Sequence, residues 1–125
     1  MNSKILIVDD EPNFVLVTKK LLEASGYKVI EAYSANEGLE KALEEEPDLI
    51  LLDIIMPYKD GFKMLAELKK DELTRHIPVI FLTAKSETNF LFEGKRFGVT
   101  DYIIKPIVAE KLLKYVRKYL ILSGK

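Results

Sequence analysis

Polar side chains of three chemical types stand directly after short apolar runs in this sequence. They are carboxylates, a hydroxyl and an ammonium: Asp9, Asp10, Asp53, Thr83 and Lys105. Grouped carboxylates repel one another and attract a hard divalent cation such as Mg²⁺, which prefers oxygen ligands. Beside such a cation an aspartate can attack phosphorus and form an acyl phosphate, while an ammonium and a hydroxyl stabilise the phosphoryl oxygens. These residue types indicate phosphoryl chemistry if the fold brings them together.

Each of these residues also has a purely structural interpretation. An aspartate that ends a strand often caps the next helix, and this is the simpler reading of Asp10 alone. Thr83 alone is more often a cap or turn residue, and Lys105 before Pro106 is more often a solvated charge at a turn. The functional interpretation gains weight from the set as a whole, because its members follow several different apolar runs in the same chain direction.

The elements that must position these residues are five short apolar runs, which alternate with longer amphipathic segments. The runs cover residues 5–8, 28–30, 49–52, 79–82 and 102–104. Three of them are apolar over four consecutive residues, which is typical of strands buried on both faces of a parallel sheet. Helix signals separate the runs, namely Pro12, Ser34 with Glu37, Asp60 and Ser86 as starts and Gly26, Pro47 and Gly98 as stops.

This alternation predicts an α/β fold, a doubly wound five-stranded parallel sheet with five helices and right-handed crossovers. On the first helix, an apolar face is expected from the helical spacing of Phe14, Val17, Leu21 and Leu22. Ligands of such sheets bind beyond the carboxyl ends of the strands, which is where the polar residues stand. Since the plan uses every element, we expect residues 1–125 to form one domain.

Four segments resemble the receiver domains of bacterial two-component response regulators, and the resemblance runs from residue 4 to about 122. The segments are residues 7–11, residues 51–57 with the pair Asp60-Gly61, residues 82–84, and residues 98–106. The resemblance implies a flavodoxin-like fold with strand order 2-1-3-4-5, in which the first and third strands are neighbours. Asp9, Asp10 and Asp53 would then surround one crevice.

The resemblance also implies the roles of the site residues. Asp53 would accept a phosphoryl group from a sensor histidine kinase or a phosphotransfer protein. Asp10, Asp53 and the backbone carbonyl of Ile55 would hold Mg²⁺, with Asp9 contributing through water. Lys105 would contact the phosphoryl group. Such a protein is a phosphoacceptor switch and not an enzyme, since it catalyses only its own phosphotransfer and dephosphorylation.

Thr83 and Tyr102 would form the switch pair that responds to phosphorylation. Thr83 would move toward the phosphate, and the ring of Tyr102 would turn inward. The output surface would be the fourth helix, the fifth strand and the fifth helix, acting on an output protein or domain that the sequence does not identify. The resemblance also allows a homodimer that forms on phosphorylation.

Composition excludes several other classes. The chain has 19 Lys and Arg against 20 Asp and Glu, a net charge of −1, which argues against direct nucleic-acid binding. It has no cysteine, so disulfides and thiolate metal sites are impossible. No apolar run approaches the roughly 18 residues of a membrane span, and a cytoplasmic location is expected.

Two alternatives remain open at this level. A pseudo-receiver is a binding module that is never phosphorylated, and it should have lost Asp53, Lys105 or the acidic pair. An aspartyl-phosphate phosphatase should carry an Asp-x-Asp motif after the first strand and a cap domain, whereas here the pair Asp9-Asp10 is adjacent.

Overall fold

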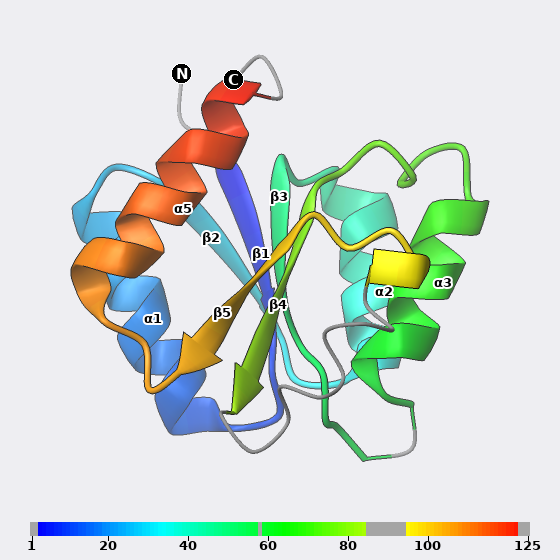
Figure 1. Cartoon of the computed structure of the whole chain (residues 1–125), viewed down its shortest axis with the longest axis horizontal. Helices are drawn as coiled ribbons and strands as arrows, with labels where there is room; N and C mark the ends of the chain where they lie inside the picture. The colour runs from blue at the N-terminus through cyan, green and yellow to red at the C-terminus, as the bar shows by residue number, and fades with distance from the viewer. Residues whose placement is uncertain (1–2, 58, 85–94, 123–125) are drawn as a thin grey trace.

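A computed structural model of the chain describes residues 3–57, 59–84 and 95–122 (Figure 1). Strands and helices alternate through these ranges: β1 (Lys4–Val8), α1 (Pro12–Ala24), β2 (Lys28–Ala32), α2 (Ala35–Glu45), β3 (Leu49–Asp53), α3 (Gly61–Lys70), β4 (Val79–Ala84), β5 (Asp101–Lys105) and α5 (Ala109–Leu122). The expected start of a fourth helix at Ser86 lies outside the described residues. At its expected end, Lys95 and Arg96 are helical, and Gly98 has a φ of 90°.

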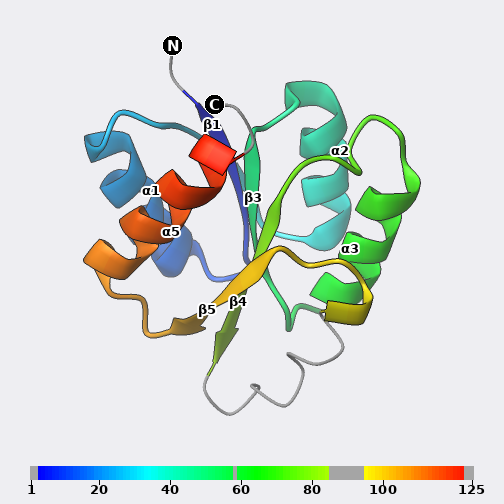
Figure 2. The same cartoon turned by 45° about the horizontal axis from the view of Figure 1, so that its top comes forward.

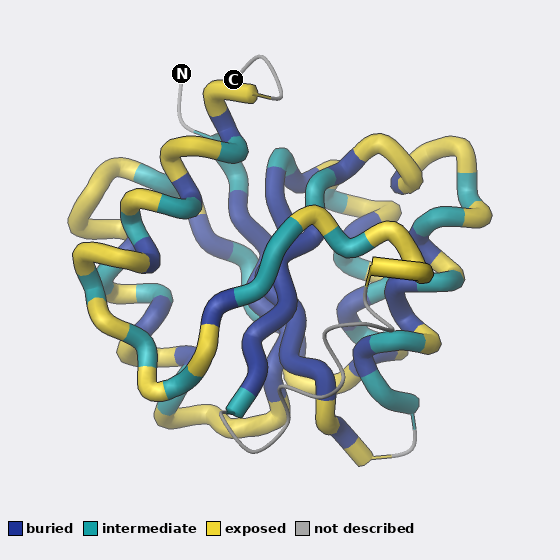
Figure 3. The backbone as a smooth tube through the Cα atoms, in the orientation of Figure 1, coloured by how far each residue is buried: buried dark blue, intermediate teal, exposed yellow. Residues whose placement is uncertain are grey.

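Within the described part of the chain, five strands form one parallel sheet in the order β2-β1-β3-β4-β5. This order confirms the expected fold. All residues of β3, and residues 5–8 of β1 and 79–83 of β4, are buried, as the dark centre of the tube in Figure 3 shows. Their continuous apolar character follows from this, because helices cover both faces of the sheet.

The helices lie in two layers, with α1 and α5 on one face of the sheet and α2 and α3 on the other (Figures 1 and 2). Strand side chains alternate between the faces, so two separate hydrophobic clusters form. One joins Ile7, Leu51 and Leu82 of the sheet to the helices α1 and α5. The other joins Leu52 and Phe81 to α2 and α3.

Several predicted helix boundaries are confirmed by hydrogen bonds. The Ser34 hydroxyl accepts from the Glu37 amide at 3.1 Å, and the Asp60 carboxylate accepts from the Lys63 amide at 3.0 Å. Gly26 follows α1 with a φ of 95°, a conformation that favours glycine. The expected apolar face of α1 was wrong in part, because Val17 is exposed.

The face that α1 buries contains Val15, Thr18 and Leu22. Val17 is 60% exposed. Apolar residues occur nearly all round this helix, so their positions alone left its orientation open. The polar Thr18 belongs to the buried stripe and hid the correct spacing. No described helix is long and apolar enough to cross a membrane.

Candidate functional site

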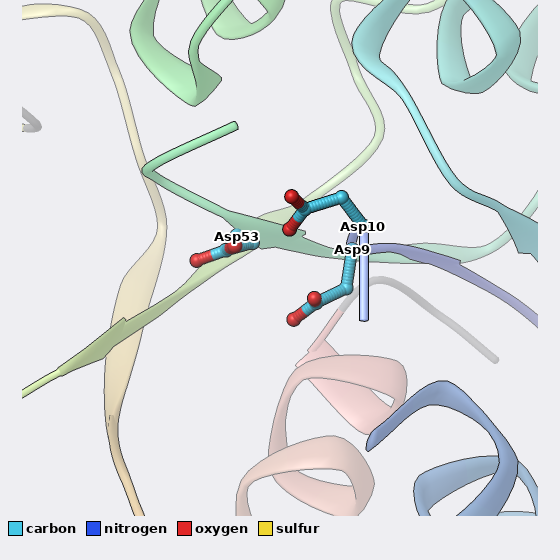
Figure 4. A group of neighbouring side chains, drawn as sticks. All are labelled: Asp9, Asp10 and Asp53. Atoms are coloured by element: carbon cyan, nitrogen blue, oxygen red, sulfur yellow. The ribbon is translucent and has the colours of Figure 1, made fainter. Parts of the chain in front are cut away.

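Three carboxylates gather where β1 and β3 end. Val8 pairs with Leu52 across these neighbouring strands, so Asp9 and Asp53 emerge side by side. Each of Asp9, Asp10 and Asp53 offers one oxygen, and these oxygens lie within 4.8 Å of one another. Figure 4 shows the three side chains next to one another at this rim of the sheet. Asp9 and Asp53 are buried, and Asp10 is exposed.

Asp9 is held by two hydrogen bonds. One of its oxygens accepts from the Glu11 amide at 3.0 Å, at the start of α1, and the other accepts from the Lys105 ammonium at 2.9 Å. The N-cap of α1 is Glu11, which makes no capping bond with its side chain. The structural interpretation of Asp10 as the residue capping this helix is therefore wrong.

Lys105 enters the site from the end of β5, on the far edge of the sheet. Its Nζ lies 2.9 Å from Asp9, 3.8 Å from Asp53 and 3.9 Å from Glu11. Burial acts to lower the pKa of Lys105, but the hydrogen bond to Asp9 and the negative charges nearby outweigh it and raise this pKa above the ordinary lysine value. The ammonium is therefore charged at neutral pH, close to the Asp53 carboxylate. The Lys105–Pro106 peptide bond is cis.

The other expected site residues lie around this group. Thr83 is fully buried one position beyond Leu82, the β4 partner of Asp53, and its hydroxyl donates to the Ala84 carbonyl at 3.2 Å. Tyr102 is half-buried on β5 against the cluster that faces α2 and α3. Ile55 lies just after β3 and is 49% exposed. The carboxylates and Lys105 are thus brought into contact, while Thr83 and Tyr102 stand on the adjoining strands.

Gly61 holds the segment after the Asp53 strand close to α3. Its amide donates to the Ile54 carbonyl at 2.7 Å. A Cβ at this position would lie 2.6 Å from the Asp53 carbonyl oxygen and 2.9 Å from the Ile54 Cα. Only a residue without a side chain fits here, which gives a physical reason for glycine directly after the capping residue Asp60.

Two neighbours of Lys105 were not predicted from the sequence. Glu11 continues the acidic run of Asp9 and Asp10, so its place near the site could have been inferred from that run. Phe14 lies with its ring centroid 4.3 Å from the Lys105 ammonium. It was interpreted as a core residue of a helix, and no local pattern links it to a residue 91 positions later.

The carboxylate group fits a divalent cation. Mg²⁺ binds hard oxygen ligands and is usually held by one or two carboxylates, with waters completing its coordination. Asp9, Asp10 and Asp53 supply such oxygens in one place, and two of them are buried. The exposed Asp10 leaves the group accessible from solvent.

Comparison with known proteins identifies the family of the chain. The sequence profile of the response regulator receiver domain matches residues 5–117. The chain belongs to this family. Receiver domains are phosphoacceptors of two-component systems, which act with histidine kinases, and they generally use Mg²⁺ at an acidic pocket.

Individual relatives place the receiver in proteins of different length. Protein PilH of Pseudomonas aeruginosa is 40% identical over 118 residues, 94% of this chain and 98% of PilH. The transcriptional regulatory protein PhoP of Bacillus subtilis is 43% identical over 106 residues, 85% of this chain but 43% of PhoP. The chain thus spans nearly all of one relative and less than half of another.

Solved receiver structures have the same fold. A CheY-like response regulator receiver domain protein from Methanospirillum hungatei superposes with a TM-score of 0.92 at 31% identity, covering 99% of this chain and 98% of the other. The chemotaxis protein CheY4 of Vibrio cholerae gives a TM-score of 0.90 at 29% identity, covering 95% of this chain and 99% of CheY4.

Proposed function

We propose that residues 1–125 form a single receiver that accepts a phosphoryl group on Asp53 from a phosphohistidine of a sensor kinase or phosphotransfer protein. The observation that carries the proposal is the setting of the Asp53 carboxylate. Asp53 is 6% exposed, and its carboxylate lies in one group with those of Asp9 and Asp10. The Lys105 ammonium is 3.8 Å from an oxygen of this carboxylate. A buried nucleophile among fixed charges suits phosphoryl transfer, which depends mainly on positioning and electrostatics.

Asp53 is the best nucleophile of the three carboxylates. Both oxygens of Asp9 accept hydrogen bonds, so that residue is held as a fixed charge. Asp10 is exposed and suits the role of a metal ligand reached from solvent. In the transfer, an Asp53 oxygen forms the bond to phosphorus as the bond from phosphorus to the histidine nitrogen breaks. The departing nitrogen keeps the electron pair.

A bound cation, Lys105 and Thr83 would stabilise the negative charge of the transferred group. Asp10, Asp53 and the Ile55 carbonyl would hold Mg²⁺, with Asp9 contributing through water, and the ion would supply positive charge to the phosphoryl oxygens when bound. The Lys105 ammonium would turn from Asp9 toward a phosphoryl oxygen. The Thr83 hydroxyl would exchange its bond to the Ala84 carbonyl for one to another phosphoryl oxygen.

Phosphorylation would then shift a two-state equilibrium. It adds nearly two negative charges, and moving a population from 1:99 to 99:1 takes about 5.5 kcal/mol. Hydrogen bonds to charged groups contribute about 1.5–3 kcal/mol each, so new bonds from Lys105 and Thr83 together reach this order. The half-buried ring of Tyr102 would follow Thr83 inward and alter the surface of β5 and α5. The expected fourth helix of this surface falls mostly on residues outside the described ranges.

The decisive experiment combines acetyl phosphate, Mg²⁺ and intact-mass measurement. We expect the wild-type protein to gain the mass of one phosphoryl group, and Asp53→Asn to gain none. Asp71→Asn is the matched control, because Asp71 lies in the turn after α3 and not in the acidic group. Its carboxylate accepts a hydrogen bond from the Leu73 amide in that turn. The phosphorylation of this variant should equal that of the wild type.

The two alternative functions give different results in the same assay. A wild-type protein that takes up no phosphoryl group would contradict the proposal and favour a pseudo-receiver. Rapid hydrolysis of a phosphate ester such as p-nitrophenyl phosphate, with many turnovers per protein molecule, would favour a phosphatase.

A further inference from the structure

The Lys105 ammonium is enclosed on two sides by different kinds of partner. On one side are the carboxylates of Asp9 and Asp53, at 2.9 and 3.8 Å. On another is the aromatic ring of Phe14, whose centroid is 4.3 Å away. The ring carries negative charge density on its face and attracts a cation placed over it. The lysine side chain is only 18% exposed as a result.

Phe14 is itself well fixed. It stands in the first turn of α1, just after Pro12, and the Val15 amide donates to the Glu11 carbonyl at 3.1 Å in the same turn. Its ring is half-buried against the hydrophobic cluster that faces α1 and α5. Lys105, by contrast, has a long and flexible side chain that loses rotamer entropy when it is held in one place. The rigid partner therefore constrains the flexible one.

A competing partner makes this constraint useful. The Glu11 carboxylate is 3.9 Å from the ammonium, and its side chain is 69% exposed. It offers the lysine a further ion pair with a carboxylate that is exposed to solvent. The groove beside the ring is lined mainly by apolar side chains, including Val17, Leu21 and Ile107, and has a volume of about 410 Å³. Without the ring, the ammonium would gain freedom to turn toward the Glu11 carboxylate, at the edge of this groove.

We propose that Phe14 is a positioning residue for phosphotransfer, whose ring face holds the Lys105 ammonium beside Asp53. The inference rests on the proposed function, since it assigns Phe14 a role in the step that phosphorylates Asp53. A cation over an aromatic ring at a partly exposed site corresponds to a change of about two- to fivefold in a rate or equilibrium constant.

The first test compares the rates of phosphorylation by acetyl phosphate with Mg²⁺. Phe14→Leu keeps an apolar side chain but removes the ring, and we expect its rate to fall about two- to fivefold. Phe14→Tyr keeps the ring and should restore a rate close to that of the wild type. Val17→Ala is the matched control, because it lines the same groove and should leave the rate unchanged. Thermal unfolding of each variant confirms that it is folded.

A double-mutant cycle separates positioning of Lys105 from a general loss of packing. In a Lys105→Ala background, measured at higher acetyl phosphate concentration, Phe14→Leu should cause no further loss. An equal loss in both backgrounds would overturn the inference, because Phe14 would then act without Lys105.

A second readout needs no phosphorylation. Trace labelling of amines with an acetylating reagent, followed by peptide mass spectrometry, should modify Lys105 faster in Phe14→Leu than in the wild type, relative to Lys4 and Lys19. If Phe14→Leu shows an unchanged rate of Lys105 labelling and normal phosphorylation, the role of Phe14 is overturned and the proposed function of Asp53 stands. If the wild-type protein takes up no phosphoryl group, the proposed function falls, and the inference falls with it.

Discussion

A single methyl group at position 61 would collide with the backbone that carries the proposed phosphoacceptor. The added Cβ of Gly61→Ala would lie 2.6 Å from the Asp53 carbonyl oxygen, and backbone cannot swing aside as a side chain can. We expect a loss of about 1–3 kcal/mol in the free energy of unfolding, together with slower phosphorylation, because the end of β3 must shift. Urea unfolding and the acetyl phosphate assay measure the two effects.

Gly38→Ala is the control for this prediction. Its Cβ would lie 2.8 Å from the Met64 side chain and 2.9 Å from that of Val8, so it meets side chains instead of the backbone of the site. It should lose stability and keep a phosphorylation rate close to that of the wild type. Equal losses of rate in the two variants would show that the position of Gly61 has no special bearing on the site.

A tyrosine at the end of α5 makes a pH-dependent contribution to stability. Burial and a hydrogen bond to Asp101 raise the pKa of Tyr119 to about 12. In the unfolded chain this pKa is about 10. The folded state therefore holds the phenol proton more tightly, and the stabilisation is complete below pH 10 and is lost as the pH rises toward 12. Melting temperatures above pH 9 should fall less steeply for Tyr119→Phe than for the wild type.

At the scale of the element, the residue that follows α2 and caps its end adopts a conformation of high energy. Glu46 has a φ of 48° and a ψ of 61°, in the left-handed region. This region costs a residue with a side chain roughly 1–2 kcal/mol, whereas glycine there costs roughly 0.4–1 kcal/mol in unfolded-chain entropy. Glu46→Gly should therefore raise the free energy of unfolding by roughly 0.5–1 kcal/mol in urea. Glu44→Gly, inside the helix, should lower it by about 1 kcal/mol.

The elements also show what could be predicted from sequence. Ser34 and Asp60 were predicted as caps because the capping pattern is local, and the strands were predicted because apolar runs are local too. The orientation of α1 was predicted in part wrongly, since Val17 and Thr18 exchange the roles that their polarity indicates. At the site, strand ends located the carboxylates and Lys105. Phe14 was missed, because its contact with Lys105 depends on how two distant elements pack.

At the scale of the molecule, Mg²⁺ should stabilise the fold through the acidic group. A ligand that binds only the folded state adds about 1.4 kcal/mol for each tenfold excess over its dissociation constant. We expect the melting temperature to rise with Mg²⁺ at constant ionic strength. Asp10→Asn should lose most of this rise, because Asp10 is the exposed member of the three carboxylates. The same rise in Asp10→Asn and the wild type would place the cation elsewhere.

The sheet divides the hydrophobic interior into two compartments. Leu112 and Val116 of α5 lie in one, and Met64 and Leu65 of α3 lie in the other, with the backbone of the strands between them. Substitutions on opposite sides should therefore have nearly additive costs. Because of this partition, the sequence on one side of the sheet can change independently of the sequence on the other. The helices of one side can acquire new surfaces for new partners, while the opposite side keeps its packing and needs no compensating change.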